Sequence, residues 1–205
     1  MIVFIAGTDT DIGKTLVASW LCLHTGYDYF KPIQTGSLES IDSNTVSELS
    51  KAKIHKESYI FENPLSPHMA AQDEESYIEL NQIKLPKNNH LIVEGAGGIL
   101  VPINDEYFIS DLITSLNLPV ILVARSSLGT INHTLLSLEY MRKRNIEILG
   151  VIMSGEINPR NKESIQRYGK VDVLAELPYI EKICFEKLRE IPLTSKLKLL
   201  FEAKK

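Results

Sequence analysis

The stretch IVFIAGTDTDIGKTLVASW, residues 2–20, places a short apolar run, a glycine-containing turn and a helix-like run in direct succession. The run IVFIA has the β-branched, uninterrupted apolar character of a strand that is buried on both faces. The turn GTDTDIGKT (7–15) lies between this strand and the helix, where backbone amides and a helix N-terminus face one anion. The stretch therefore predicts a phosphate-binding loop.

This loop departs from the usual G-x-x-x-x-G-K-[ST] pattern, because the two glycines are separated by the five residues 8–12. Lys14 can place a charge on the outer phosphates, and Thr15 can place its hydroxyl on Mg²⁺. Two acids, Asp9 and Asp11, lie inside the loop, although carboxylates repel phosphates. A turn that merely caps a helix is the alternative, but the flanking strand and helix favour nucleotide binding.

Similar apolar runs and helix-like stretches alternate along the chain. The expected strands are residues 2–6, 27–30, 90–96, 119–124, 147–153 and 171–178. The expected helices are residues 14–24, 43–51, 109–116, 131–144 and 162–168, with an amphipathic tail at 196–205. This alternation implies βαβ units. We predict one domain over residues 1–205 with a three-layer α/β fold of the P-loop NTPase type, in which helices cover both faces of a mainly parallel β-sheet. The polar segment 53–89 is expected to be irregular and to wrap an edge.

Composition excludes several classes of protein. The chain has 205 residues, of which 44% are hydrophobic and 23% charged, values typical of a soluble domain with a sizeable core. Its net charge of −4 argues against a nucleic-acid binder, which would be basic. No apolar run approaches the ~18 residues that span a membrane, and no cationic segment with a cleavage site precedes the first strand. We therefore expect a cytoplasmic protein with no nucleic-acid or membrane partner.

The two cysteines, Cys22 and Cys184, are too few and too far apart to suggest a disulfide scaffold or a zinc site. We expect two buried thiols in a reducing cytosol.

Two polar clusters follow expected strands at their carboxyl ends, where an open α/β sheet binds its ligands. LIVEGAGG (91–98) carries Glu94, followed by glycines that let a backbone approach a nucleotide. Because Mg²⁺ takes one or two protein acids together with phosphate and water, we interpret Glu94 as a metal ligand rather than a solvated acid. FKPIQTG (30–36) carries Lys31, which fits either a solvated charge or a second clamp on a transferring phosphate or substrate anion.

The segment SSLGTINHTLLSLEY (126–140) is a glycine-containing turn that opens a helix. We predict that free amides at the start of this helix hold a carboxylate; these belong to Gly129, Thr130, Ile131 and Asn132. His133 lies in the first helical turn and receives no catalytic role. Asp42 lies in an exposed polar stretch and by itself indicates a helix N-cap.

Six blocks of the chain together resemble the dethiobiotin synthetase family of the biotin pathway, in that family's order. The family's loop has the pattern G-T-D-T-x-x-G-K-T, so the additional loop residue is typical of it. The blocks cover most of residues 2–180 and are GTDTDIGKT, FKPIQTG, SPH (66–68), VEGAGG (93–98), PVILVARSSLGTINH (119–133) and AELPYI (175–180).

The resemblance implies a cyclo-ligase that forms C–N bonds and acts as a homodimer. Its substrates would be 7,8-diaminopelargonate (7,8-diaminononanoate), CO₂ and ATP, with Mg²⁺ as the cofactor, and its products dethiobiotin, ADP and phosphate. Because this substrate is a diamine, an acid in the loop such as Asp11 offers an acceptor for an amine.

The resemblance also implies roles for single residues. The implied catalytic residues are Lys31, Lys14 and Thr10. The implied Mg²⁺ ligands are Thr15, Asp42 and Glu94. The implied ATP contacts are Asp11, Ile12, Gly13, Lys14, Thr15, Leu16, Asp42, Glu94, Gly95, Ala96, Gly97, Ser154 and Pro178. The implied substrate contacts are Thr10, Lys31, Thr35 and, across the dimer interface, the helix N-terminus at Gly129, Thr130, Ile131 and Asn132.

The chain departs from the family at two positions. Ser154 stands where the family often has an Asn that reads the nucleotide base. Serine offers the base a single hydroxyl, whereas the Asn amide offers both a donor and an acceptor. We therefore expect weaker purine discrimination. Ala175 stands where a glycine is common.

Two rival interpretations are weaker. A partition- or nitrogenase-type ATPase shares the fold, but its loop reads K-G-G-x-G-K-T, and the position of that early lysine is Asp9 here. A corrin-pathway amidoligase would carry an additional glutaminase domain with a nucleophilic cysteine, for which 205 residues leave no room.

Overall fold

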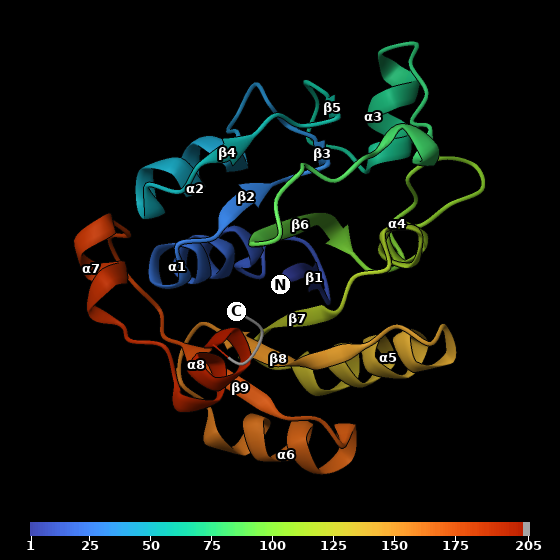
Figure 1. The fold of residues 1–205 in the computed structure, drawn as a ribbon. Helices are drawn as coiled ribbons and strands as arrows, with labels where there is room; N and C mark the ends of the chain where they lie inside the picture. The colour runs from blue at the N-terminus through green and yellow to red at the C-terminus, as the bar shows by residue number, and fades with distance from the viewer. Residues whose placement is uncertain (203–205) are drawn as a thin grey trace.

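The computed structural model describes residues 1–202, and its centre is a seven-stranded sheet with the strand order β4-β2-β6-β1-β7-β8-β9 (Figure 1). Neighbouring strands pair in parallel throughout. The strands of this sheet are β1 (Ile2–Gly7), β2 (Asp28–Phe30), β4 (Ile54–His55), β6 (Leu91–Gly98), β7 (Val120–Arg125), β8 (Ile148–Ser154) and β9 (Val173–Leu177). A separate parallel pair is formed by β3 (Ile33–Gln34) and β5 (Tyr59–Ile60).

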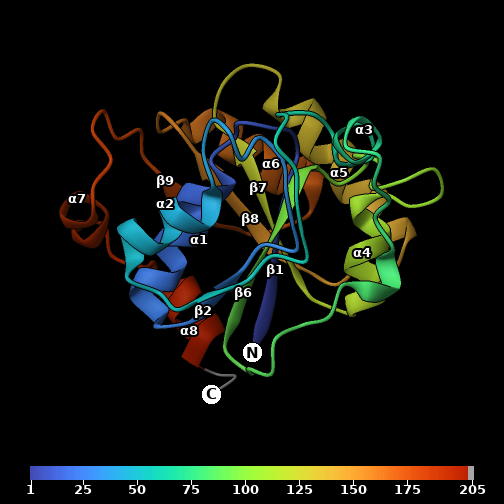
Figure 2. The same ribbon diagram turned by 90° about the horizontal axis from the view of Figure 1, so that it is seen from above.

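Helices cover both faces of the sheet and make a three-layer α/β fold, as predicted (Figure 2). One face carries α1 (Lys14–Thr25), α2 (Asp42–Ser50), α7 (Phe185–Glu190) and α8 (Ser195–Glu202). The other face carries α3 (Pro67–Asp73), α4 (Ile109–Leu116), α5 (Thr130–Lys143) and α6 (Pro159–Gly169). A short 3₁₀ helix, η1, spans Leu80–Gln82.

The apolar run of β1 explains why the sheet needs both layers. Val3 and Ile5 pack into one hydrophobic cluster with α1, whereas Phe4 and Ala6 pack into the other with α4. Because successive side chains of a strand point to opposite faces, a run of buried apolar residues requires cover on each side. All four side chains are fully buried.

The C-terminal part of the chain is tied to the helix that follows the phosphate loop. Trp20 of α1 is 1% exposed, and its indole Nε1 donates a hydrogen bond of 2.7 Å to the carbonyl of Ile191. The chain around α7 therefore packs against α1 and α2, beside the carboxyl end of the sheet.

The segment 53–89 is more ordered than predicted, because it contains β4, β5, α3 and η1. Its strands have two residues each, too few to give a periodic signal. The segment does reach the edge of the sheet, since β4 pairs with β2 there.

Two helices also differ from the predictions. The helix expected at 162–168 begins earlier, at Pro159, because the side chain of Asn158 caps it by accepting a hydrogen bond from the amide of Asn161. Helix α7 was not predicted. The expected tail helix is present as α8, and its last three residues, 203–205, lie outside the described residues. None of the helices within residues 1–202 is long and apolar enough to cross a membrane.

Candidate active site

A cleft of about 740 Å³ opens at the carboxyl end of the sheet, where the chain leaves β1, β2 and β6. The phosphate loop forms one wall, and the start of α2 forms another. The sequence-predicted residues that line it are Thr10, Asp11, Ile12, Gly13, Lys14, Thr15, Leu16, Lys31, Thr35, Asp42, Glu94, Ala96 and Gly97.

The remaining predicted residues do not line this cleft in the described part of the chain: Gly95, Ser154, Pro178 and residues 129–132. Gly95 packs against the core, since a Cβ built there would lie 2.9 Å from the Phe4 ring. Ser154 lies against the phosphate loop, and its Oγ would be 2.5 Å from a Cβ built on Gly13.

Two predictions about helix starts are wrong, one for α5 and one for α2. The amide of Thr130 is not free, because it donates to the carbonyl of Ser127 at 3.2 Å in the turn that precedes α5. Asp42 is not an N-cap, because Ile41 occupies that position and Asp42 is the first residue of α2. The Asp42 carboxylate instead faces Lys31.

The phosphate loop accommodates its additional residue through backbone conformation. Asp11 adopts a left-handed conformation with φ 53°. Gly7 permits a close approach of neighbouring segments, since a Cβ there would lie 2.8 Å from the Asp9 carbonyl and 2.9 Å from the Gly97 carbonyl. The side chain of Lys14 lies against Gly7, and its Nζ donates a hydrogen bond of 2.8 Å to the Asp9 carbonyl. Burial lowers the pKa of Lys14, and the nearby Glu94 carboxylate opposes that change.

The two acids of the loop have different surroundings. The Asp9 carboxylate forms an ion pair with Arg125 at the end of β7 and accepts a hydrogen bond from the Thr10 amide at 2.8 Å. Asp9 is therefore directed away from the anion site and neutralised. Asp11 is exposed and lines the cleft.

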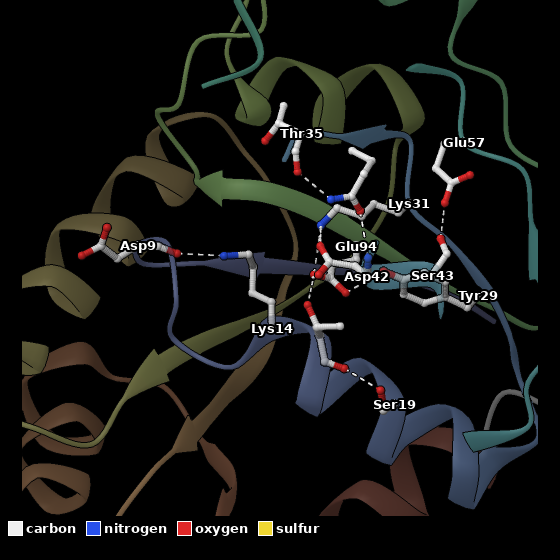
Figure 3. A network of polar contacts seen from close by, with 12 residues as sticks. Asp9, Lys14, Ser19, Tyr29, Lys31, Thr35, Asp42, Ser43, Glu57 and Glu94 are labelled. Atoms are coloured by element: carbon white, nitrogen blue, oxygen red, sulfur yellow. Dashed lines mark hydrogen bonds and ion pairs between the residues drawn. The ribbon is translucent and has the colours of Figure 1, made fainter. Parts of the chain in front are cut away.

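A buried charge cluster lies beside the loop (Figure 3). The ammonium of Lys31 lies 2.5 Å from Oδ2 of Asp42 and 3.2 Å from Oε1 of Glu94. Glu94 is 1% exposed and also accepts hydrogen bonds from Thr15 Oγ1 at 2.9 Å and the Tyr29 hydroxyl at 2.8 Å. Every oxygen of this buried carboxylate thus has a donor, as a buried charge requires.

Charge pairing decides the protonation states in this cluster. Burial alone lowers the pKa of Lys31, but the carboxylates of Glu94 and Asp42 outweigh burial and raise it. Burial, together with Glu94, raises the pKa of Tyr29. Lys31 is therefore a cation and Tyr29 a neutral donor at neutral pH.

The same cluster has the donor chemistry of a magnesium site. The carboxylates of Asp42 and Glu94 flank one cation, the Lys31 ammonium, and the Thr15 hydroxyl donates a hydrogen bond to Glu94. Residues 1–202 contain no group of three or more His, Cys, Asp or Glu side chains arranged for a metal. A metal here would have two carboxylates and a hydroxyl, to which Mg²⁺ adds phosphate and water ligands.

Several residues that line the cleft received no role from the sequence: Gln34, Glu48, Leu49, residues 64–67, Val101 and Ile183. Gln34 and residues 66–67 belong to the blocks FKPIQTG and SPH, which carried the family resemblance. Ile183 comes from the C-terminal segment, which carried no motif.

Comparisons with known proteins agree with this arrangement. A family model described as an AAA domain matches residues 2–187. The ATP-dependent dethiobiotin synthetase BioD of Lawsonia intracellularis is 54% identical over 198 residues, covering 97% of this chain and 98% of that protein. The protein of the same name in Paramagnetospirillum magneticum is 47% identical over 192 residues, covering 93% of this chain and 94% of that protein.

The chain belongs to the dethiobiotin synthetase family. Membership gives it a role in biotin biosynthesis as an ATP-dependent ligase. The fold is shared more widely than this family: a ParA family ATPase from Chlorobium tepidum TLS superposes with a TM-score of 0.56 at 11% identity, over 99% of this chain and 96% of that one. That likeness concerns the fold alone.

For this dethiobiotin synthetase family member, we predict that Lys31→Met lowers the free energy of unfolding. The substitution leaves the carboxylate of Glu94 buried without its cation, and removal of one partner of a buried ion pair destabilises by about 3 kcal/mol. Urea denaturation of the ligand-free protein would measure the change.

Lys53→Met is the matched control, because Lys53 is 72% exposed and lies 4.0 Å from Asp28. We expect this control to change stability by less than about 1 kcal/mol. Equal effects of the two substitutions would contradict the prediction.

Proposed function

We propose that this protein carboxylates 7,8-diaminopelargonate (7,8-diaminononanoate) with CO₂ and closes the ureido ring at the expense of ATP, releasing dethiobiotin, ADP and phosphate. The observation that carries this proposal is the buried ammonium of Lys31 beside the phosphate loop, held by Asp42 and Glu94. It places an ammonium group, fixed in position by two carboxylates, where a substrate anion and the γ-phosphate of ATP would meet. The family relationship supports the same reaction.

The reaction proceeds in three steps. One amine adds to CO₂ and loses a proton, which gives a carbamate. A carbamate oxygen then attacks the γ-phosphorus, and the bond from phosphorus to the bridging oxygen breaks, so that ADP leaves. The second amine finally attacks the carbonyl carbon of this mixed anhydride, loses a proton and expels phosphate, which closes the ring.

The chain's own residues have defined tasks in these steps. Negative charge on the phosphoryl oxygens and the carbamate is stabilised by the ammonium groups of Lys14 and Lys31. Thr10 and Thr35 line the cleft and offer hydroxyl groups to the substrate. Both lysines are nearly buried, 7% and 4% exposed, so water weakens their charges little.

Thr15, Asp42 and Glu94 would hold Mg²⁺ in this proposal. When bound, the metal neutralises phosphoryl charge and orients the nucleotide. The remaining nucleotide contacts that we propose in the cleft are Asp11, Ile12, Gly13, Lys14, Leu16, Ala96 and Gly97. Ser154 and Pro178 lie outside the cleft lining, and we propose that they contact the base; Gly95 packs against the core and is not proposed as a contact. We propose that the whole chain acts as one domain in the cytoplasm, a reducing compartment that suits its two free cysteines. Cys22 is buried as predicted, whereas Cys184 is only partly buried.

Diamine-dependent ADP release tests the proposed reaction. We predict turnover only when diamine, bicarbonate, Mg²⁺ and a nucleoside triphosphate are all present. GTP or CTP should support rates within about tenfold of ATP, because Ser154 offers the base one hydroxyl, and one hydrogen bond is worth about 1 kcal/mol. Ser154→Asn is the matched variant and should restore preference for ATP. ADP release that does not require the diamine would instead identify a nucleotide-driven switch.

Asp11 is proposed to accept a hydrogen bond from an amine of the substrate, since its carboxylate is exposed in the cleft. We predict that Asp11→Asn raises KM for the diamine about tenfold and changes KM for ATP less, because a hydrogen bond to a charged group is worth about 1.5–3 kcal/mol. Steady-state kinetics at saturating ATP measures this effect. Asp9→Asn is the control, because Asp9 faces Arg125. Unchanged diamine KM in Asp11→Asn would refute the assignment.

A homodimer is proposed, with the N-terminus of α5 at Gly129, Ile131 and Asn132 receiving the carboxylate of a substrate bound mainly to the partner; the amide of Thr130 is excluded because it donates to Ser127. Exposed apolar side chains on this part of the surface support an interface: Leu128 is 98% exposed and Leu136 64%.

We predict that Leu136→Glu shifts the protein from dimer to monomer mass in light scattering, because a charge would be buried in the interface. The same variant should raise diamine KM while nucleotide binding persists. Leu199→Glu is the control, since Leu199 is 67% exposed on α8. A monomeric mass for the unmodified protein would exclude the proposed dimer.

A further inference from the structure

Helix α2 begins without a capping side chain of its own. Its N-cap residue is Ile41, which has an extended backbone and makes no side-chain hydrogen bond to the first helical turn. The first amides of a helix have no partner within the helix. A side chain from elsewhere must therefore satisfy the amide of Asp42, the first residue of α2, or it is left to water.

The side chain of Gln34 supplies this partner. Its Oε1 accepts a hydrogen bond of 3.0 Å from the Asp42 amide, and its Nε2 donates one of 2.6 Å to the carbonyl of Thr35. Gln34 is 3% exposed, and its own carbonyl accepts from the Phe61 amide at 2.9 Å. Both the backbone and the side chain of Gln34 are thus fixed.

The backbone amide and the side-chain carboxylate of Asp42 are consequently both held by the short segment 31–34. Gln34 binds its amide, and Lys31, three residues earlier on that segment, binds its carboxylate at 2.5 Å. Figure 3 shows Thr35, Lys31 and Asp42 grouped around this network. The next residue of α2 is held separately, because Ser43 donates to the Glu57 carboxylate.

We infer that Gln34 is a positioning residue that places the carboxylate of Asp42 for Mg²⁺ binding. This inference rests on the proposed metal site. Groups that orient a metal ligand commonly change metal affinity by about 10–100-fold when removed. Gln34 acts here on the backbone of the ligand, so that its loss lets the first turn of α2 move away from Glu94 and Thr15.

The test measures metal binding without turnover. Calorimetric titration of Mg²⁺ into the full-length protein, saturated with an ATP analogue that cannot be hydrolysed, gives the Mg²⁺ concentration at half-saturation. We expect Gln34→Met, which is similar in size but makes neither hydrogen bond, to raise this concentration about tenfold. Gln34→Asn retains the amide but is one methylene too short, and should have the same effect if Gln34→Met fails to fold.

Two controls separate positioning from a general loss of structure. Ser43→Ala removes the neighbouring hydrogen bond of α2 and should lower the melting temperature without moving the Mg²⁺ midpoint. Affinity for the analogue in the absence of Mg²⁺ should be equal in Gln34→Met and the unmodified protein. A large change there would mean that Gln34 contacts the nucleotide directly and would overturn the inference.

Asp42→Asn distinguishes failure of this inference from failure of the proposed metal site. An unchanged midpoint in Asp42→Asn would remove both. A raised midpoint in Asp42→Asn with an unchanged midpoint in Gln34→Met would remove the role of Gln34 alone. If Gln34 acts through Asp42, the double variant should bind Mg²⁺ no more weakly than Asp42→Asn.

Discussion

Burial of the Lys31 ammonium between the carboxylates of Asp42 and Glu94 is the constraint on which the rest of this site depends. Lys31 and Glu94 are buried and Asp42 is 27% exposed, and removing charges from water is unfavourable unless they meet in good geometry. Lys31 follows β2, Glu94 lies in β6, and Asp42 opens α2. The fold must therefore bring the end of β2, the middle of β6 and the start of α2 to one place. The adjacency of β2 and β6 in the sheet brings the first two together, and packing of α2 against α1 brings the third.

The phosphate loop shows how one additional residue changes the use of a common turn. Asp11 absorbs the extra length in a left-handed backbone, and Asp9 is turned toward Arg125. The loop pattern of a switch-type ATPase has a lysine at the position of Asp9. In this chain the residue there is an acid, whose charge is paired with Arg125 of the same chain. The loop is therefore stabilised internally.

Sequence patterns anticipated the parts of the fold whose signal is local. The strands at 2–6 and 119–124 are apolar without interruption because both faces are covered, and the glycine-containing turn between a strand and a helix locates the loop. The apolar periodicity of α6 does not extend to its first turn, where Asn158 caps the helix and Pro159 opens it, so the predicted helix begins too late. Strands of two residues, such as β4, carry no periodicity and cannot be predicted from it.

The candidate site was anticipated where its residues belong to motifs and missed where their roles come from tertiary contacts. Lys31 follows β2, Glu94 lies within β6 and Thr15 lies in the first turn of α1, and the structure brings them together. Gln34 receives its role only from its contact with residue 42. The bonded amide of Thr130 likewise depends on how the preceding turn closes, which the glycine at 129 did not reveal.

The chain has a single tryptophan, and its position makes it an intrinsic fluorescent probe of the region beside the cleft. The Trp20 indole lies on the helix that carries the phosphate loop and is bonded to Ile191, and the C-terminal segment also contributes Ile183 to the cleft. Indole emission depends on hydrogen bonding and water around the ring. Separation of that segment from α1 would expose the ring and shift its emission to longer wavelength, so movements next to the nucleotide can be followed without an attached dye.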